Sequence, residues 1–574
     1  MRIRSAFLCL GAIYSAGAVG ACGSLDSGAI NIIDASGGST NGGGRTGGAG
    51  SGSGGISNAG RGGAGGSTAG NAGASGAPET GGQAGAAGEG GMAGSSGAPT
   101  GGGSGGPGLE GGAGAGGEGG AGGEAGGPAS GCTPTSCVGS TPICAAGGVC
   151  RACVTNAECA ADDAKVPFCH LGSCVSCLTS ADCPATTPVC GTDYKCRTCA
   201  EGSECGTLAC TAKGTCATAA QTVYALAQTG SSASDCGTMA APCLNLGVAA
   251  SKLSAARPHL VLIATKSSFN EGAVLPADVD AVVFGNHVRV APYDGSVGFT
   301  IKGGSVMLDD VFVEASAPSM AGATAAAISC TGAKIKMRKG QITDSATSYG
   351  SAGLLLSACD ADVQQATFIG SQTGIVSACP AAACPTPSQT LTVERSLFRG
   401  NKNAISFDGK SFLIRNNLFL RNGNTSYVDI IGIRGVSGIF AYNTMVGNEN
   451  NCSYEGGLVS CEGGAMSCGT FSSNLSWNNM LNASSMPPSP CPDQVYYSPP
   501  PLTNSLSETT WPGTGNISGM DPKFVDAAKD NYTPGAGSPA LNKGSTVAGI
   551  VPDVDYYGNP RSRSAPDIGA IEAQ

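Results

Sequence analysis

The sequence predicts an all-β protein whose second half is a parallel β-solenoid, preceded by a disordered glycine-rich linker and small disulfide-rich repeats. Three observations support this prediction. A short pattern of apolar and turn residues recurs every 21 to 31 positions in the second half of the chain. Cysteines cluster in four similar units ahead of it, and the 95 glycines of the 574 residues are concentrated earlier still.

Residues 1–21, MRIRSAFLCLGAIYSAGAVGA, have the build of an export signal, in which arginines precede a short apolar run that ends in small residues. The run is too short to span a bilayer. The stretch VGAC at 19–22 looks like a bacterial lipobox, in which the cysteine thiol is acylated, so we expect Cys22 to carry a lipid anchor. A plain secretory signal cut near Ala21 is the alternative. Both interpretations place the product outside the cytoplasm, as an outer-membrane or cell-surface lipoprotein or as a secreted protein.

Glycine makes up roughly half of the stretch from Gly37 to Gly131, and Ala, Ser and occasional Glu fill most of the rest. Glycine does not recur strictly at every third position, so the stretch is not collagen-like. Because it has few apolar side chains to bury, it cannot offset the entropy lost on ordering. We expect residues 22–131 to form a disordered tether.

Sixteen cysteines between residues 132 and 216 form four units of four, and C-x-x-C joins each unit to the next. The phrases TPIC, VPFC and TPVC fall at the third cysteine of the first three units, which supports a true repeat. Zinc is the alternative, but it would leave several cysteines unexplained and needs thiolates outside the cell. Disulfides use all sixteen, although spacing alone does not fix their connectivity. The expected disulfide cysteines are Cys132, Cys137, Cys144, Cys150, Cys153, Cys159, Cys169, Cys174, Cys177, Cys183, Cys190, Cys196, Cys199, Cys205, Cys210 and Cys216, with Cys236 and Cys243 as a further nearby pair.

The repeating pattern is an apolar residue, a small or polar residue three positions later, and an apolar residue five positions later. Its members are Met307/Asp310/Phe312, Met337/Gly340/Ile342, Val363/Ala366/Phe368, Val393/Ser396/Phe398, Ile414/Asn417/Phe419, Phe440/Asn443/Met445 and Phe471/Asn474, where Ser476 takes the last apolar place. Two short strands around a turn, repeated in this way, form coils that bury their apolar positions on the next coil. We expect Asn417, Asn443 and Asn474 to stack in register and to share side-chain hydrogen bonds.

Open ends of a solenoid need caps. A predicted helix from about Leu244 to Ala255 suits the amino-terminal end, and segments 516–544 and 552–574 are expected to close the other end.

These rungs, with GSPALNKG, DYYGNPR and PDIGAIE, resemble bacterial right-handed parallel β-helix proteins of the pectin-lyase-like superfamily, whose last coils end in a D-x-D-G-x-P-R…DIGAxE segment. The resemblance covers about residues 220–574 and implies a right-handed parallel β-helix. Tyr557 lengthens the Asp–Gly spacing and Ile571 replaces a usual aromatic residue. The matching residues are Asp553, Asp555, Gly558, Pro560, Arg561, Asp567, Gly569 and Glu572. The front half of the chain, with its lipobox, tether and cysteine units, resembles surface proteins of myxobacteria.

The superfamily contains polysaccharide lyases, hydrolases and epimerases beside members without known activity, so the fold leaves the activity open. Lyases of this type combine acidic calcium ligands with an Arg or Lys base, and hydrolases need two or three carboxylates at one cleft. In this chain the acids of the rungs stand apart from one another and beside bases, which favours a solvated face. The catalytic alternative is Glu394 with Arg395 and Arg415 meeting an anionic sugar. The column that carries Arg395 is predicted to contain Asp309, Lys339, Gln365, Arg395, Asn416, Tyr442 and Ser473.

Other polar groups are assigned structural roles. The carboxylate pairs Asp309-Asp310 and Asp360/Asp362 are expected to form turns. His170, His259 and His287 are scattered, so we expect no catalytic histidine, no metal site and no cofactor. The Asp and Arg residues of DVDYYGNPR are expected to make structural hydrogen bonds.

The long proline-rich loop from Met486 to Pro512 carries three aromatic residues, Tyr496, Tyr497 and Trp511. They are candidates for stacking on sugars, and packing of the loop onto the rod is the alternative. A formal net charge of -10 argues against nucleic acid as a partner. We therefore expect a non-catalytic surface lipoprotein that presents a β-helix for adhesion or glycan contact, with an extracellular polysaccharide or another cell-surface component as partner and with the membrane reached only through the lipid. A polysaccharide lyase or hydrolase is the alternative.

Overall fold

The computed structural model describes Cys132 and residues 137–146, 149–263, 265–293, 296–315, 325–344, 351–377, 388–423, 429–450, 458–461, 469–481 and 502–574. The predicted signal peptide 1–21, the anchor Cys22, the whole tether 22–131, and the loop residues Tyr496 and Tyr497 lie outside these ranges.

The cysteine units are confirmed as disulfide modules, and the structure resolves their connectivity. In each unit the first cysteine bonds the third and the second bonds the fourth. The pairs are Cys132–Cys144 and Cys137–Cys150, Cys153–Cys169 and Cys159–Cys174, Cys177–Cys190 and Cys183–Cys196, and Cys199–Cys210 and Cys205–Cys216. The units contain β1 (Ile143–Cys144), β2 (Cys150–Arg151), α1 (Asn156–Asp162), β3 (Phe168–His170), β4 (Ser173–Val175), η2 (Ser180–Asp182), β5 (Val189–Cys190), β6 (Cys196–Arg197) and η3 (Gly202–Cys205). Crossed disulfides constrain the unfolded chain of modules that are too small to bury a large core.

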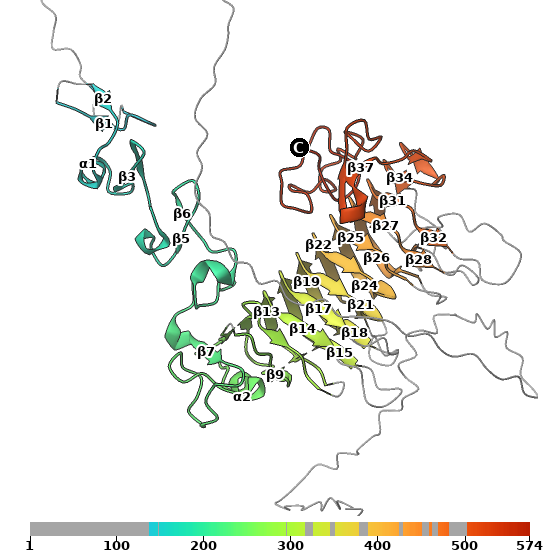
Figure 1. Cartoon of the computed structure of the whole chain (residues 1–574), viewed down its shortest axis with the longest axis horizontal. Helices are drawn as coiled ribbons and strands as arrows, with labels where there is room; N and C mark the ends of the chain where they lie inside the picture. Colours follow the sequence, from blue (N-terminus) through green and yellow to red (C-terminus); the bar gives the residue numbers. More distant parts are fainter. Residues whose placement is uncertain are drawn as a thin grey trace, which may run out of the picture. The chain divides into compact units, whose positions relative to one another are not determined.

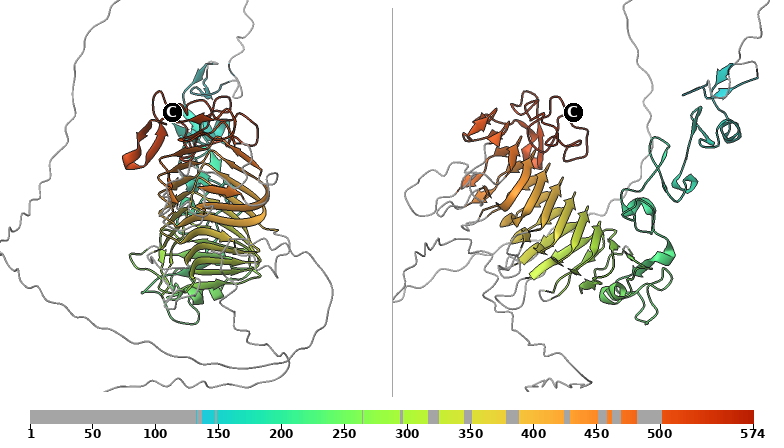
Figure 2. Two further views of the ribbon diagram at one scale, coloured as in Figure 1. Left: turned by 90° about the vertical axis from the view of Figure 1, so that its right-hand side faces the viewer. Right: turned by 180° about the vertical axis from the view of Figure 1, so that it is seen from behind.

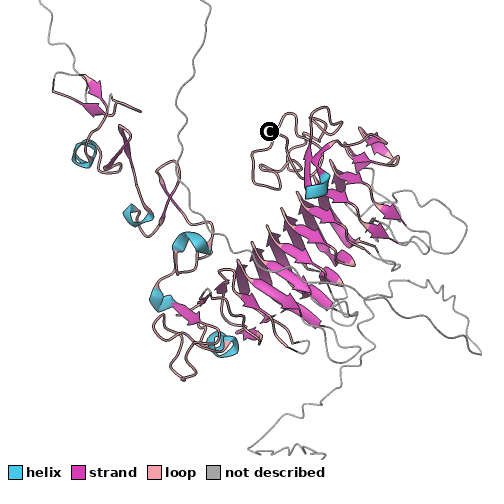
Figure 3. Cartoon of the chain, in the orientation of Figure 1, coloured by secondary structure: helices cyan, strands magenta, loops and turns pink. Residues whose placement is uncertain are grey.

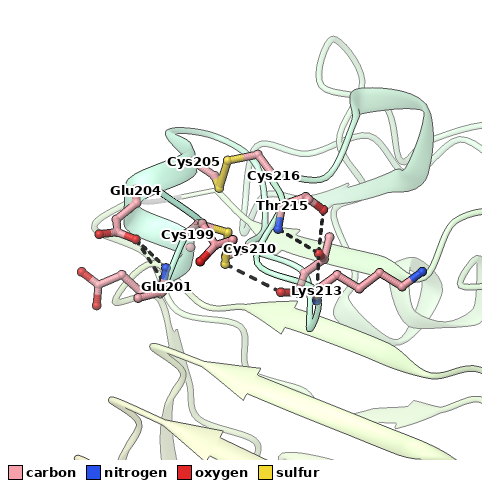
Figure 4. The surroundings of a disulfide bond; sticks show 12 residues. Cys199, Glu201, Glu204, Cys205, Cys210, Lys213, Thr215 and Cys216 are labelled. Atoms are coloured by element: carbon pink, nitrogen blue, oxygen red, sulfur yellow. Dashed lines mark hydrogen bonds between the residues drawn. A yellow bond between two sulfur atoms is a disulfide. The ribbon is translucent and has the colours of Figure 1, made fainter. Parts of the chain in front are cut away.

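An acidic residue stands directly before the second cysteine in three of the units, as Glu158, Asp182 and Glu204. Each accepts hydrogen bonds from two backbone amides at the start of its short helix, for example Glu204 from Ala200 at 2.6 Å. Figure 4 shows Glu204 in this position beside the Cys205–Cys216 disulfide. The hydrogen bond from the Arg151 side chain, and to a smaller extent those from the two backbone amides, lower the pKa of Glu158 to about 2. The repeated acid therefore fixes the same turn in each module.

The solenoid consists of two sheets of parallel strands whose successive coils stack along one axis (Figures 1, 2 and 3). The first sheet holds β7 (Thr222–Ala225), β8 (His259–Leu262), β9 (Ala273–Leu275), β10 (Ala281–Phe284), β12 (Phe299–Lys302), β13 (Ser305–Asp309), β15 (Ala325–Thr331), β16 (Lys334–Arg338), β18 (Ser351–Ser357), β19 (Asp360–Gln364), β21 (Thr373–Ser377), β22 (Thr390–Glu394), β24 (Asn403–Arg415), β26 (Ile431–Ala441), β29 (Val459–Cys461), β30 (Thr470–Ser472), β33 (Leu502–Thr503) and β35 (Gly513–Thr514). The second sheet holds β11 (Arg289–Val290), β14 (Phe312–Ala315), β17 (Gln341–Asp344), β20 (Thr367–Ile369), β23 (Leu397–Arg399), β25 (Leu418–Leu420), β27 (Thr444–Val446), β31 (Leu475–Trp477), β34 (Leu506–Ser507) and β36 (Ile517–Ser518).

The remaining elements lie beside the two sheets. They are η4 (Ala219–Gln221), α2 (Leu246–Ser251), β28 (Glu449–Asn450), β32 (Met480–Leu481), β37 (Phe524–Asp526), η6 (Ala527–Lys529) and β38 (Asn531–Pro534). The helix α2 is shorter than predicted. Its buried face, Leu246, Ala249 and Ala250, joins the core next to the Cys236–Cys243 disulfide.

A single column of inward-pointing residues runs through the first sheet and confirms the predicted stacking. Its members are in-register partners on successive strands, and each is at most 1% exposed: Val223, Leu260, Val283, Leu308, Met337, Val363, Val393, Ile414, Phe440, Phe471 and Leu502. In the second sheet the rings of Phe368 and Phe398 stack with centroids 4.8 Å apart. The solenoid thus extends beyond the seven predicted coils at both ends.

The predicted alignment of the first coil was wrong by one residue. Leu308, not Met307, pairs with Met337, and Val313, not Phe312, takes the inward position of the second strand. Met307 and Leu308 are both apolar, so the pattern alone did not distinguish them. In the corrected register Asp310 joins the column of Lys339 and Arg395, and Asp309 moves opposite Arg338.

Buried asparagines form two ladders at the turns. The predicted ladder is confirmed, because Asn443 donates through Nδ2 to Ile414 O at 2.9 Å and accepts at Oδ1 from the Asn417 backbone amide at 3.1 Å. The next hydrogen bond runs from the Asn443 amide to Asn474 Oδ1 at 3.0 Å. A second ladder, Asn401, Asn422, Asn448 and Asn479, lies five residues later on each coil and has the same geometry. These ladders satisfy buried backbone groups that the turns would otherwise leave without partners.

We predict that Asn443→Ala lowers the free energy of unfolding by about 2–4 kcal/mol, because it leaves the buried Asn417 amide without its acceptor and removes the hydrogen bond that Asn443 donates to the Ile414 carbonyl. Urea denaturation of the full chain measures the change. Asn270 is exposed, and its side chain accepts a hydrogen bond from Ser268. Asn270→Ala is therefore the control, expected to stay within about 0.5 kcal/mol of the wild type. Equal losses for both variants would contradict the role of the ladder.

Segments 516–544 and 552–574 were expected to close the end of the solenoid. The first contributes β36, the last strand of the second sheet, whereas the second lies along the outer face of that sheet. Ala570 and Ile571 pack on Leu418, Leu420 and Val446, which point outward from β25 and β27. The reason is that these outward positions are apolar and need a cover. Trp511, 5% exposed, joins the core near the last coils together with Leu502.

Arg561 holds this segment in place and confirms the structural role of DVDYYGNPR. Its side chain is fully buried and donates to Glu572 Oε2 at 2.9 Å and to Asn416 Oδ1 at 3.1 Å. It also donates to two backbone carbonyls, and its guanidinium carbon lies 4.7 Å from the centroid of the Tyr442 ring. Burial raises the pKa of the Glu572 carboxyl, and the Arg561 charge opposes that rise.

We predict that Arg561→Met destabilises the fold by about 3–5 kcal/mol, because it leaves the Glu572 charge buried without a cation. Arg563 is the matched control. It pairs with Asp553, and both side chains are more than three-quarters exposed. Arg563→Met should therefore change stability by less than about 1 kcal/mol in thermal or urea unfolding. A mild Arg561→Met phenotype would show that the segment is not held through this arginine.

Candidate functional site

An open groove of about 460 Å³ crosses five coils of the first sheet. It lies at the turns that connect paired strands, such as β12 to β13 and β15 to β16. Gly304 and Gly332 have positive φ angles, so much of its floor is backbone. The groove is lined by Asp280, Gly304, Ser305, Gly332, Ala333, Lys334, Ala358, Asp360, Ser388 and Gln389.

The Cys330–Cys359 disulfide links strand β15 to the turn between β18 and β19, beside the groove. The sequence analysis did not pair these cysteines. Their separation of 29 residues is close to the local coil length, since Cys330 pairs in register with Leu356, and this spacing is the signal that would have found them.

The two acids of the groove are committed to backbone amides. Asp280 accepts from the Ser305 amide at 3.0 Å, and Asp360 accepts from the amide of Thr390 at 2.9 Å and from its hydroxyl at 3.0 Å. Lys334 lies between Ser305 and Asp360 on the neighbouring strands. Its amino group has no ion-pair or hydrogen-bond partner among the described residues. The groove therefore offers one unpaired cation, exposed backbone and a hydroxyl.

The structure pairs two of the three candidate catalytic residues with each other and places the third on a turn. Glu394 and Arg415 are register partners on β22 and β24 and form an ion pair, with side chains 20% and 22% exposed. Arg395 lies on the following turn with φ 51°. Because Arg415 already neutralises Glu394, the arrangement is that of a partly solvated ion pair on a sheet face.

Two further carboxylates of the rungs, Asp309 and Asp362, are engaged as well. Arg338 binds Asp309 through two nitrogens, at 2.9 and 2.8 Å. Lys336 Nζ lies 3.3 Å from Asp362. The three histidines have different surroundings. His170 packs on Tyr194, His259 is buried on β8, and His287 contacts Asp310.

Of the three residues predicted to stack on sugars, the structure describes Trp511, and it does not support that role. Trp511 is buried in the core, so it is not available to a glycan, and packing onto the rod is correct for it. Tyr557 is 53% exposed and contacts Tyr556 with ring centroids 5.1 Å apart. It is the residue that lengthens the Asp–Gly spacing in DYYGNP, and this insertion is the signal that the sequence analysis left unused.

The groups of three His, Cys, Asp or Glu residues close enough to hold a metal are, within the described ranges, all cysteine triplets. Each cysteine in them is disulfide-bonded. Thiolates are the metal ligands, so these triplets are accounted for by the disulfides.

These features define a parallel β-helix protein with disulfide-rich modules at its amino-terminal side. Comparison of the sequence with protein-family models gives no match, and no curated protein matches it either. In the part of the chain that the structure describes, no helix is long and apolar enough to cross a membrane.

Proposed function

We propose that this is an exported surface protein that displays its β-helix for contact with glycans and does not catalyse a reaction on them. The groove of the first sheet carries the proposal, because it is open, extends over several coils and is lined by polar groups. Long concave sites of this kind suit an extended chain that is bound through hydroxyl and amide hydrogen bonds. Lys334 supplies a directional donor in its middle.

The absence of turnover is proposed from the state of the carboxylates. Both acids of the groove accept hydrogen bonds from the backbone, and Glu394 and Asp309 are paired with arginines. A general acid needs a raised pKa and a nucleophile needs a free carboxylate, so committed carboxylates suit positioning better than catalysis. The resemblance to right-handed pectin-lyase-like proteins agrees with a glycan partner and leaves the activity open.

We predict saturable binding of the full chain to one class of polysaccharide in a panel of neutral and acidic glycans. Lys334→Ala should weaken that binding about threefold to tenfold, the effect of losing one solvent-accessible hydrogen bond. Lys336→Ala is the control, since Lys336 carries the same charge two residues along and pairs with Asp362 outside the groove lining. Release of reducing ends, or of unsaturated products that absorb ultraviolet light, would instead identify a hydrolase or a lyase. No binding to any glycan would exclude the proposed ligand class.

Localisation at the surface is proposed to depend on acylation of Cys22. Cys22→Ser should move the protein from the membrane fraction to the soluble fraction and remove the lipid mass from its amino-terminal peptide. An unchanged distribution would favour the plain secretory signal.

A further inference from the structure

The fourth cysteine unit, residues 199–216, packs against the outer face of the first coils. Ala209, together with Ala217 just after the unit, joins Tyr224, Val261, Val282, Phe284 and Met307 in one buried cluster. The Gly202 amide donates to Asp309 Oδ2 at 2.7 Å. A Cβ atom on Gly202 would lie 2.4 Å from Phe284 Cδ2, so only glycine permits this approach. The unit is thus docked onto the β-helix through a specific contact.

A small cavity of about 140 Å³ lies at this contact. The unit contributes Glu201, Gly202 and Ser203, and the β-helix contributes Phe284, His287, Asp309, Asp310 and Lys339. Most of the charges are paired: Lys339 binds Glu201, and Arg338 binds Asp309. Farther out, burial and then the Arg395 charge lower the pKa of Lys339. Glu204 lies near enough to Arg338 for their opposite charges to attract.

Asp310 is the exception among these carboxylates. Its side chain is 13% exposed, and its one ion-pair partner among the described residues is His287, whose Nδ1 lies 2.9 Å from Asp310 Oδ1. The imidazole is itself 87% exposed and therefore a weakly held partner. Burial raises the pKa of Asp310 to about 6, the His287 charge opposes the rise and the Asp309 charge adds to it.

We propose that the contact between the fourth cysteine unit and the β-helix is a pH-sensitive latch, which loosens when the Asp310 carboxyl ionises. Undocking removes the wall formed by Glu201, Gly202 and Ser203, and water then reaches the carboxylate. Because hydration favours the ionised form, the undocked state becomes more stable relative to the docked state as Asp310 loses its proton.

The direction of the pH dependence of docking follows from the linkage between docking and proton binding by Asp310. The pKa of Asp310 is raised in the docked state and returns toward its ordinary value when exposed. Docking is therefore strongest below the ordinary pKa and weakens as the pH rises to about 6, after which it stays constant. The Glu201–Lys339 pair acts in the opposite direction, since it is lost when Glu201 takes up a proton. His287 belongs to the β-helix in both states and changes the midpoint, not the sign.

Hydrogen–deuterium exchange of the full chain tests the latch, read in the peptide that covers residues 200–208. After correction for the intrinsic exchange rate, protection of this peptide should fall about tenfold between pH 5 and pH 7. In Asp310→Asn, this fall in protection with rising pH should be absent, because the carboxyl group that causes it is gone. Asn tolerates the left-handed conformation that Asp310 has, with φ 54°, so the variant is expected to fold.

Asp362→Asn is the control, because Asp362 pairs with Lys336 on the same sheet outside the cavity, and it should keep the wild-type pH dependence. A second variant, His287→Gln, removes the cation that faces Asp310 and should move the midpoint to higher pH. The same pH response in the wild type and Asp310→Asn would overturn the latch. So would an unchanged midpoint in His287→Gln.

Discussion

The structure depends on the burial of the inward-pointing residues of each coil against their in-register partners on the coils before and after. No single coil has enough residues to enclose a core, so each coil is stable only when its neighbours cover it. The column from Val223 to Leu502 meets this requirement without a break. Because side chains alternate between the two faces of a strand, a shift of one residue would turn the whole column outward.

This constraint also explains where polar groups are tolerated. Turns between the two sheets bring backbone groups close to the core, and on the later coils the asparagine ladders satisfy these groups from one coil to the next. The residue before each position of the first ladder has a left-handed backbone, as at Asn416, Tyr442 and Ser473, and Asp310, Lys339 and Arg395 have the same conformation at the corresponding turns of earlier coils. The carboxylates and bases that looked catalytic stand on the outside of this arrangement, where they pair with each other.

A second consequence of the stacking is seen at two places on the outer surface of the solenoid. Where outward positions are apolar, another part of the chain covers them: the fourth cysteine unit at Tyr224 and Val261, and the carboxyl-terminal segment at Leu418 and Leu420. The groove at Lys334 lies on the turns of the first sheet, where successive coils expose backbone to solvent.

Much of the fold could be predicted from the sequence, because apolar periodicity, turn asparagines and cysteine spacing are local signals. The first coil shows the limit: Met307 and Leu308 satisfy the pattern equally well, and only packing against Met337 decides between them. The second asparagine ladder was visible as the N-x-x-x-x-N spacing of Asn417 and Asn422 but was not used. The burial of Trp511 and the position of Ile571 depend on long-range packing that no local pattern encodes. The candidate site was predicted least well, since the Glu394–Arg415 pair follows from the register whereas the groove follows from the shape of the turns.

The register of the stacked coils is tested most directly by cross-linking. Thr392 and Leu413 are outward-facing partners on β22 and β24, so Thr392→Cys combined with Leu413→Cys should form a disulfide that is found by mass spectrometry of the non-reduced digest. Thr392→Cys combined with Phe412→Cys should not cross-link, because Phe412 faces the core. The reverse result would show that neighbouring coils do not stack in this register and would contradict the account.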